Sequence, residues 1–197
     1  MKYNTIRPDH EIILGQIEAG ASVLDLGCGK GDLLQLLIKE KMVRAQGIEK
    51  AEEDIYSCVE KGLAVFHGDI DTGLSEYGDN NFDYVVLNQS FQQVTKPDLV
   101  LQEALRVGKK VIVGFPNFVY LPARLQFFFL GRTPLTPSLP YRWYDTPNLH
   151  FLSILDFTEY CSKRKIKVLR SYFIRKKKRI NLFPNLLAET GLFVLTK

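Results

Sequence analysis

A glycine turn between an apolar segment and a helical segment near the N-terminus constrains this chain most strongly. Residues 23–26 form a short apolar run around one acid, Asp25, as expected for a buried parallel strand. Three glycines follow at alternate positions within residues 27–31, and a helical pattern begins at Asp32. Glycine tolerates positive φ and lets a ligand approach the backbone closely. Strand, glycine turn and helix in this order predict the opening βαβ unit of a nucleotide-binding fold.

The spacing of the glycines and the neighbouring acid indicate which ligand the turn accepts. A dinucleotide-binding turn reads G-x-G-x-x-G and holds a pyrophosphate, whereas the third glycine here comes one residue earlier. Asp25 would repel phosphates and attract a cation. S-adenosylmethionine (SAM) has no phosphate and carries a sulfonium and an ammonium group. We therefore expect SAM or S-adenosylhomocysteine rather than NAD; the alternative is a turn that has lost its ligand.

Composition predicts a single domain. The chain has 197 residues, of which 46% are hydrophobic and 24% charged, as in ordinary globular proteins. No apolar run has the length of a membrane span, and residues 1–5 do not resemble a signal peptide. Cys28, Cys58 and Cys161 form no metal-binding pattern and favour a reducing compartment. We expect one cytoplasmic domain over residues 1–197, with no metal site and no membrane contact.

Alternating strand and helix patterns predict an α/β fold. The predicted strands cover residues 23–26, 44–49, 63–66, 82–87, 109–115, 167–174 and 191–196. The predicted helices begin near Pro8 and cover residues 32–41, 52–61, 97–108 and 153–164. Such alternation gives a mostly parallel sheet with helices on both faces.

Polar residues at the ends of two predicted strands extend the predicted ligand site. Glu49 ends the second strand about twenty residues after the glycines, where an acid binds ribose hydroxyls. Asn88 and Gln89 follow the fourth strand, at the edge where open α/β sheets bind ligands. These side chains are expected to face the cofactor or a substrate, although Glu49 as an ordinary surface residue is the alternative.

Residues 118–151 form an insertion that is much longer than a usual loop. It combines an apolar stretch, residues 125–130, with several prolines and an aromatic segment. Because it follows the fifth strand, we expect it to arch over the ligand edge as a lid or a protein interface. His150 is a general base or a structural histidine. The basic run 175–179 is a solvated turn or a nucleic-acid contact.

The glycine segment D-x-G-x-G-x-G resembles the first motif of class I SAM-dependent methyltransferases. The resemblance implies a Rossmann-like, seven-stranded, mostly parallel sheet whose last strand is antiparallel. It also implies that Asp69, after the third strand, faces the adenine amino group; a turn-capping role is the alternative. The amino-methylating signature N/D-P-P-Y is absent after the fourth strand, and no catalytic residue is identified. The expected cofactor-binding residues are Asp25, Gly27, Cys28, Gly29, Gly31, Glu49, Lys50, Asp69, Ile70, Asn88 and Gln89.

Four segments together resemble a narrower family, the bacterial methionine-biosynthesis proteins of the MetW type. The segments are residues 23–31, 82–87, 114–118 and 140–150, within a similarity over residues 7–174. The resemblance implies a methyltransferase fold that works beside homoserine O-acetyltransferase. We expect the chain to support that enzyme by direct contact. The alternatives are a small-molecule methyltransferase and, least favoured because its positive charge is confined to one loop, a nucleic-acid methyltransferase.

Overall fold

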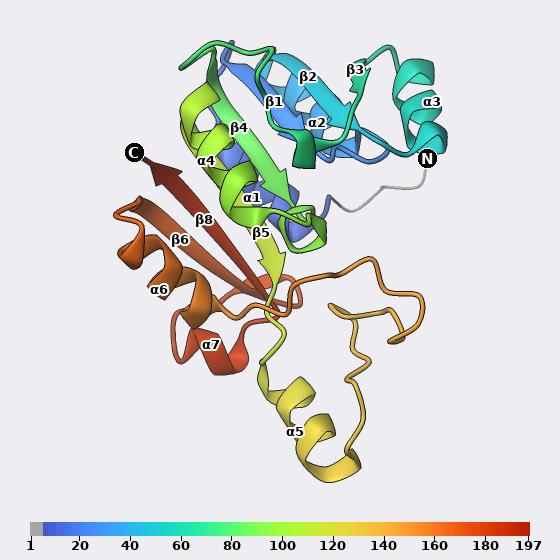
Figure 1. The fold of residues 1–197 in the computed structure, drawn as a ribbon, viewed down its shortest axis with the longest axis vertical. Helices are drawn as coiled ribbons and strands as arrows, with labels where there is room; N and C mark the ends of the chain where they lie inside the picture. The colour runs from blue at the N-terminus through green and yellow to red at the C-terminus, as the bar shows by residue number, and fades with distance from the viewer. Residues whose placement is uncertain (1–5) are drawn as a thin grey trace.

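A computed structural model describes residues 6–197 as one sheet covered by helices on both faces (Figure 1). The strand order is β3-β2-β1-β4-β5-β8-β6-β7. The strands are β1 Ser22–Leu26, β2 Arg44–Glu49, β3 Ala64–His67, β4 Phe82–Asn88, β5 Gly108–Pro116, β6 Lys167–Arg175, β7 Lys178–Arg179 and β8 Thr190–Thr196.

The pairing of the strands confirms the predicted methyltransferase-like sheet. Strands β1 to β5 are parallel, and β8 enters antiparallel between β5 and β6. The sheet has eight strands rather than the expected seven, because β7 adds a two-residue strand to the end of β6. Such a short strand has no sequence pattern of its own, since it is part of the basic run.

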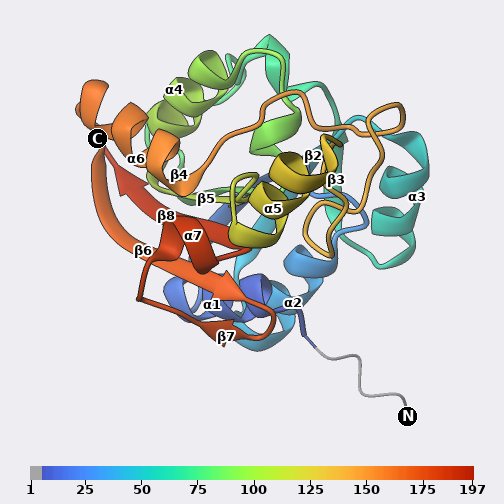
Figure 2. The same cartoon turned by 90° about the horizontal axis from the view of Figure 1, so that it is seen from below.

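The helices divide between the two faces of the sheet. They are α1 Pro8–Gln16, α2 Asp32–Lys41, α3 Glu52–Glu60, α4 Pro97–Val107, α5 Leu121–Leu130, α6 Ile154–Lys163 and α7 Pro184–Leu187, with short 3₁₀ turns η1 Ile70–Thr72 and η2 Phe91–Gln93. Helices α1 and α2 pack on one face and α4 and α6 on the other (Figure 2). Alternate residues of β4 serve the two cores: Tyr84 and Val86 face α1, whereas Val85 and Leu87 face α4.

Sequence signals at helix ends explain where the helices begin and stop. Ser153 caps α6 with its hydroxyl on the Asp156 N–H, while the Asp156 carboxylate accepts the Ser153 N–H. Gly62 has φ +70 and follows Lys61, the C-cap residue of α3, and Pro97 begins α4. Each element predicted from these signals lies within two residues of its observed bounds.

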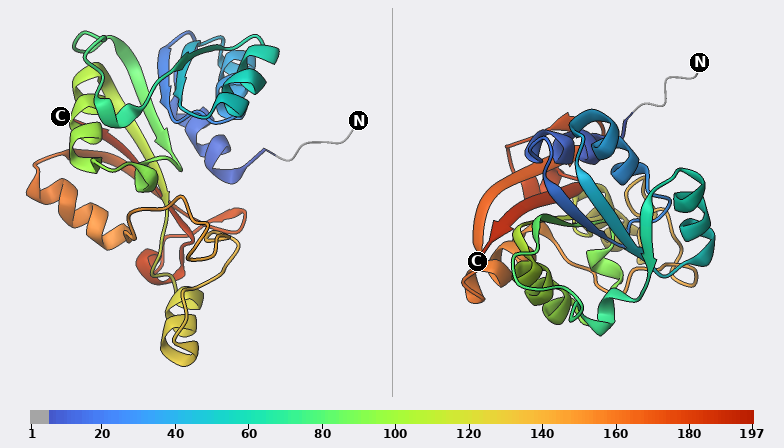
Figure 3. Two further views of the ribbon diagram at one scale, coloured as in Figure 1. Left: turned by 45° about the vertical axis from the view of Figure 1, so that its right-hand side comes forward. Right: turned by 90° about the horizontal axis from the view of Figure 1, so that it is seen from above.

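The insertion leaves the sheet after β5 and carries α5 away from the body of the protein (Figures 1 and 3). A small core of Phe118, Tyr120, Ala123 and Leu139 holds its base. The returning loop is fixed on η2, because the N–H groups of residues 149 and 150 both donate to the Gln92 carbonyl, at 2.9 and 3.0 Å. The insertion is therefore anchored at its base and at its return, with α5 beyond both anchors.

No helix within residues 6–197 is long and apolar enough to cross a membrane. The same residues contain no group of three or more His, Cys, Asp or Glu side chains positioned to hold a metal ion. All three cysteines are free thiols.

Candidate cofactor site

A cavity of about 320 Å³ lies at the carboxyl ends of β1, β2 and β4. Its walls come from the glycine turn, the start of α3, η1 and η2. This is the edge at which open α/β sheets bind nucleotides, because the helices and turns that follow parallel strands meet there. A volume of this size suits one small organic ligand.

Four of the five backbone N–H groups of residues 27–31 donate to the protein itself. Those of Gly27 and Cys28 donate to the Ile48 carbonyl at 2.8 and 3.2 Å. The Gly29 N–H donates to the Glu49 carboxylate at 2.9 Å, and the Gly31 N–H to the Cys28 carbonyl at 3.0 Å. A pyrophosphate site needs such donors free. Within residues 27–31 only the Lys30 N–H remains for a ligand, which disfavours a pyrophosphate in the turn.

Glu49 links the turn to the next crossover. Its second carboxylate oxygen accepts the N–H groups of Lys50 and Ala51 at 2.8 and 2.9 Å, where α3 begins. The Glu49 carboxylate is therefore fixed in orientation by three backbone donors while it lines the cavity. The oxygen bonded to Gly29 keeps a lone pair for a further donor, such as a hydroxyl, whereas the other oxygen already accepts two N–H groups.

Asp25 lies beneath the turn and is only 3% exposed. Within residues 6–197 its carboxyl makes no hydrogen bond. Burial, and secondly the negative charge of Glu49, raise the pKa of Asp25 to about 7. A buried carboxyl of this kind would be stabilised by a nearby cation.

Close packing explains why glycine is required in the turn. Gly27 has φ +75, and a Cβ there would lie 2.7 Å from the Ser90 Cβ. A Cβ on Gly31 would collide with Leu63 and lie 2.9 Å from the Cys58 sulfur. Cys28 fills the space over Gly47, and burial followed by the Asp25 charge raises the pKa of its thiol, so Cys28 is an unreactive packing residue.

The 3₁₀ turn η1 closes one side of the cavity. The Asp69 carboxylate accepts the Asp71 N–H at 3.0 Å, which is the turn-capping role considered from the sequence, and Asp69 also lines the cavity. Asp71 accepts the N–H groups of Thr95 and Lys96 at 2.9 and 2.8 Å. Burial would raise the pKa of Asp71, but these donors outweigh it and hold the pKa below its usual value.

Asn88 and Gln89 face different surroundings although they are consecutive. Asn88 donates to the Asp9 carboxylate at 2.9 Å and packs against Gly114, so it does not line the cofactor cavity. Gln89 has φ +65, a conformation uncommon for a side-chain-bearing residue, and does line it. Its carbonyl accepts the side-chain amides of Gln92 and Gln93 at 2.8 and 2.9 Å, which stabilises the bend.

Seven of the eleven residues expected from the sequence line the cavity. They are Gly27, Gly29, Glu49, Lys50, Asp69, Ile70 and Gln89. Four others do not: Asp25, Cys28, Gly31 and Asn88. The other lining residues were not expected from the sequence; they are Ile48, Ala51, Asp54, Gly68, Asp71, Ser90, Gln93 and Val94. Ala51 and Asp54 follow Glu49 into α3 and were predictable from that position, whereas the residues of η1 and η2 carry no helix or strand signal.

A second cavity, of about 700 Å³, adjoins the first along the same edge of the sheet. Gln89 and Gln93 line both cavities. Its other walls come from the start of α1, the ends of β5 and β6, the turn between β6 and β7, and residues of the insertion. His150 lines neither cavity, and its Nε2 is buried without a hydrogen-bond partner among the described residues.

Sheet order and site position define a class I SAM-dependent methyltransferase fold. A SAM-dependent methyltransferase from Archaeoglobus fulgidus superposes with a TM-score of 0.69 at 16% identity, over 95% of this chain and 94% of that one. The [4+2]-cyclase SpnF superposes with a TM-score of 0.66 at 15% identity, over 96% and 81%. Similarity at this level of identity defines the fold alone.

Residues 7–195 match the family described as methionine biosynthesis protein MetW, so the chain belongs to the MetW family. It is also 35% identical over 200 residues to the bifunctional methionine biosynthesis protein MetXA/MetW of Rhodopirellula baltica. That alignment covers 95% of this chain and 32% of the relative, so the chain spans about a third of the relative's length. The family expected from the four sequence segments is confirmed.

Proposed function

We propose that this MetW-family protein binds SAM or S-adenosylhomocysteine and supports homoserine O-acetyltransferase by direct contact. The observation that carries the proposal is the exposed aromatic surface of α5, in a chain whose Rhodopirellula relative joins MetXA and MetW in one polypeptide. A covalent fusion keeps two partners at a high effective concentration. Separate chains of the same kind would need a contact surface instead.

The charge around the first cavity supports an adenosyl cation as the ligand. Its lining has a single lysine, Lys50, and four acids: Glu49, Asp54, Asp69 and Asp71. Asp25 lies beneath the turn without a hydrogen bond, and a nearby cation would stabilise the ionised form of its carboxyl. The engaged N–H groups of the turn disfavour a pyrophosphate. In this arrangement Glu49 would bind the ribose hydroxyls and Asp69 the adenine amino group.

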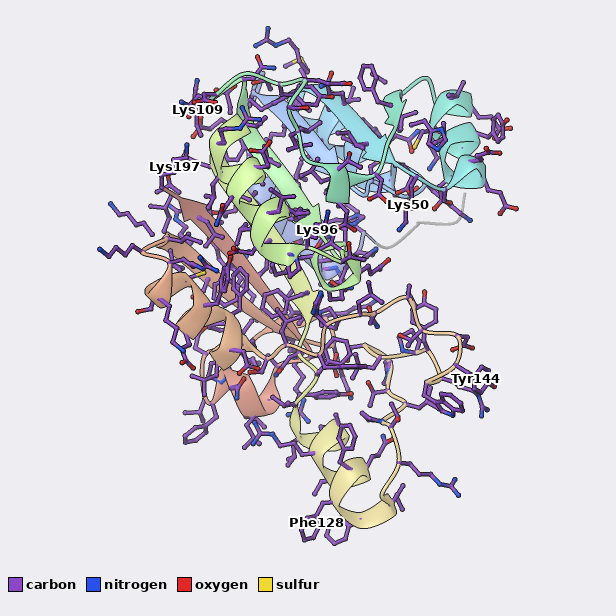
Figure 4. All side chains as sticks on the ribbon, viewed as in Figure 1. Lys50, Lys96, Lys109, Phe128, Tyr144 and Lys197 are labelled. Carbon is purple, nitrogen blue, oxygen red and sulfur yellow. The ribbon has the colours of Figure 1, made fainter. Side chains whose placement is uncertain are left out.

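The surface of α5 supports the protein contact. Only Ala123 of this helix is buried, while Phe127, Phe128 and Phe129 are 53, 82 and 70% exposed. Figure 4 shows Phe128 near the free end of α5, with Tyr144 on the returning loop. Aromatic side chains are enriched in protein interfaces and costly to leave in water. Between the two roles expected for the insertion, this exposure favours an interface over a lid.

Co-purification and acetyl transfer test the proposal. The two proteins should co-elute, and this chain should raise the rate of acetyl transfer from acetyl-CoA to homoserine. The double variant Phe128→Ser/Phe129→Ser should abolish both effects, because a hot-spot aromatic pair is worth roughly 3 kcal/mol or more. As a matched control, Tyr56→Ser/Val59→Ser removes exposed apolar side chains from α3 and should leave both effects intact. The proposal fails if the wild-type proteins neither co-elute nor change the rate.

A small-molecule methyltransferase is the second candidate, and the adjoining cavity favours it. That cavity shares Gln89 and Gln93 with the cofactor cavity, so an acceptor there would lie next to the sulfonium. Methyl transfer can proceed by positioning alone. Consumption of SAM with an identified methylated product would establish this activity, and binding of SAM without turnover across a panel of acceptors would count against it.

A further inference from the structure

The two adjoining cavities have opposite charge. The first has four acids against one lysine. The second has three cations against two acids, namely Arg7, Lys176 and Lys177 against Asp9 and Glu189. We propose that the second cavity binds a small organic anion, with its anionic group at the two lysines.

Lys176 and Lys177 are the cations left to bind a ligand. Arg7 is already paired with Asp9, whose carboxylate accepts two guanidinium bonds at 2.6 and 3.1 Å. Although burial opposes it, the Arg7 charge helps to hold the pKa of Asp9 below its usual value, so this pair stays ionised. Within residues 6–197 neither lysine makes an ion pair. Both lysines are exposed to solvent and line the cavity, so their side chains can bring two ammonium groups to a carboxylate or phosphate.

The fold fixes the backbone that carries these lysines. Arg175 and Lys178 pair across β6 and β7, so Lys176 and Lys177 form the two-residue turn between them. The Lys176 N–H donates to the Glu189 carboxylate at 2.9 Å, which ties the turn to the start of β8. The basic run is therefore divided, with two members at the cavity and three outside it. A nucleic-acid surface would instead use the run as a whole.

The remaining walls indicate an apolar body on the ligand. Apart from the charged residues, six lining residues are apolar or aromatic: Pro8, Pro116, Pro137, Pro140, Tyr141 and Ile174. Six are polar and uncharged: Gln89, Gln92, Gln93, Ser138, Asn148 and Thr190. Among the polar residues, Gln92 is 3% exposed, and its Oε1 has no hydrogen-bond partner among the described residues. Buried polar atoms without partners are uncommon and mark places where a ligand or water completes the structure. These walls suit an anion with a short apolar or aromatic body.

Three small ligands that share a phenyl ring show whether binding depends on the negative charge or only on the ring. Benzoate and phenyl phosphate carry an anionic group on an aromatic body, whereas benzamide is neutral. In titrations of ¹⁵N-labelled protein we expect saturable shifts of the Gln89, Gln92 and Glu189 amides with both anions and none with benzamide. The ratio of the two dissociation constants tells whether the site prefers a carboxylate or a phosphate.

Two charge-matched double variants locate the site. Lys176→Gln/Lys177→Gln should weaken binding of both anions about tenfold, because two charge-assisted contacts are lost. Arg175→Gln/Lys178→Gln removes the same charge outside the cavity and should change binding by less than about twofold. Lys177→Gln alone tests the site without altering the Lys176 turn, which has φ +54.

Four results would overturn the proposal. They are equal weakening by the two double variants, benzamide binding as tightly as benzoate, the absence of saturable shifts with either anion, and binding of a single-stranded RNA that both double variants weaken alike. The last result would assign the run to a nucleic-acid surface rather than to the cavity.

Discussion

At the scale of the residue, Asp25 is held in a costly state until a ligand arrives. Its carboxyl is buried without a donor, beside the Glu49 charge. The pKa of Asp25 is about 7 in the folded protein, whereas its ordinary value is 3.8. Between pH 3.8 and about pH 7 the folded protein therefore keeps a proton on Asp25 that the unfolded chain releases. The free energy of unfolding therefore falls as pH rises through this window. A cation bound near Asp25 would favour the ionised carboxylate and so would offset this loss of stability.

The variant Asp25→Asn should remove this pH dependence. We expect it to be more stable than the wild type by up to roughly 4 kcal/mol at pH 8, and nearly equal in stability at pH 4, where residue 25 is neutral in both folded proteins. Urea unfolding of the two proteins at both pH values is the measurement. A stability difference that does not change with pH would contradict the assignment of the raised pKa to Asp25.

Glycine is required at position 27 for two reasons: the backbone has a positive φ, and Ser90 leaves no room for a Cβ. Gly20 provides the control, since it has φ +74 and an added Cβ would meet nothing within 4 Å. Gly20→Ala should cost about 1–2 kcal/mol from backbone strain alone. Gly27→Ala should cost about 3 kcal/mol, because it adds overlap with Ser90, and should also abolish SAM binding. Equal costs for the two variants would mean that the Ser90 contact is unimportant.

At the scale of the element, a single cap determines how α6 begins. Ser153→Ala removes the hydroxyl acceptor of the capping box and should lower the free energy of unfolding by about 1 kcal/mol. Ser57→Ala is the control, because its exposed hydroxyl bonds only to the carbonyl of Glu53 within its own helix. Chemical unfolding of both variants measures the difference. If Ser57→Ala costs as much as Ser153→Ala, the cap contributes nothing particular.

Elements with a periodic apolar pattern were predictable, and those without one were not. The strands 23–26 and 82–87 and the helix from Pro97 carry burial and capping signals in their own residues. The two-residue strand β7 is held by hairpin pairing with β6. The turns η1 and η2 have local bonds and are fixed in place by bonds to residues distant in the sequence, from residues 95 and 96 to Asp71 and from residues 149 and 150 to Gln92. The apolar stretch of the insertion was visible, but the sequence does not encode that α5 buries only Ala123.

At the scale of the whole molecule, one edge of the sheet gathers residues that are far apart in the sequence. Arg7, Pro137 and Lys176 line one cavity although they come from three separate segments. No local sequence pattern predicts that residues from these three segments line the same cavity. Gln89 and Asn88 show why the site was predicted only in part. The positive φ of Gln89 interrupts the alternation of side chains between the two faces of β4. The sequence therefore did not indicate that Gln89 lines the cofactor cavity whereas Asn88 bonds to Asp9. The edge as assembled offers an acidic cavity beside a basic one.

Calorimetric titration of the purified protein with SAM and with NAD tests the central claim, that the first cavity is built for an adenosyl cation. The acidic lining and the engaged N–H groups of the glycine turn predict saturable one-to-one binding of SAM and no saturable heat with NAD. Saturable binding of NAD, or no binding of SAM, would contradict the account.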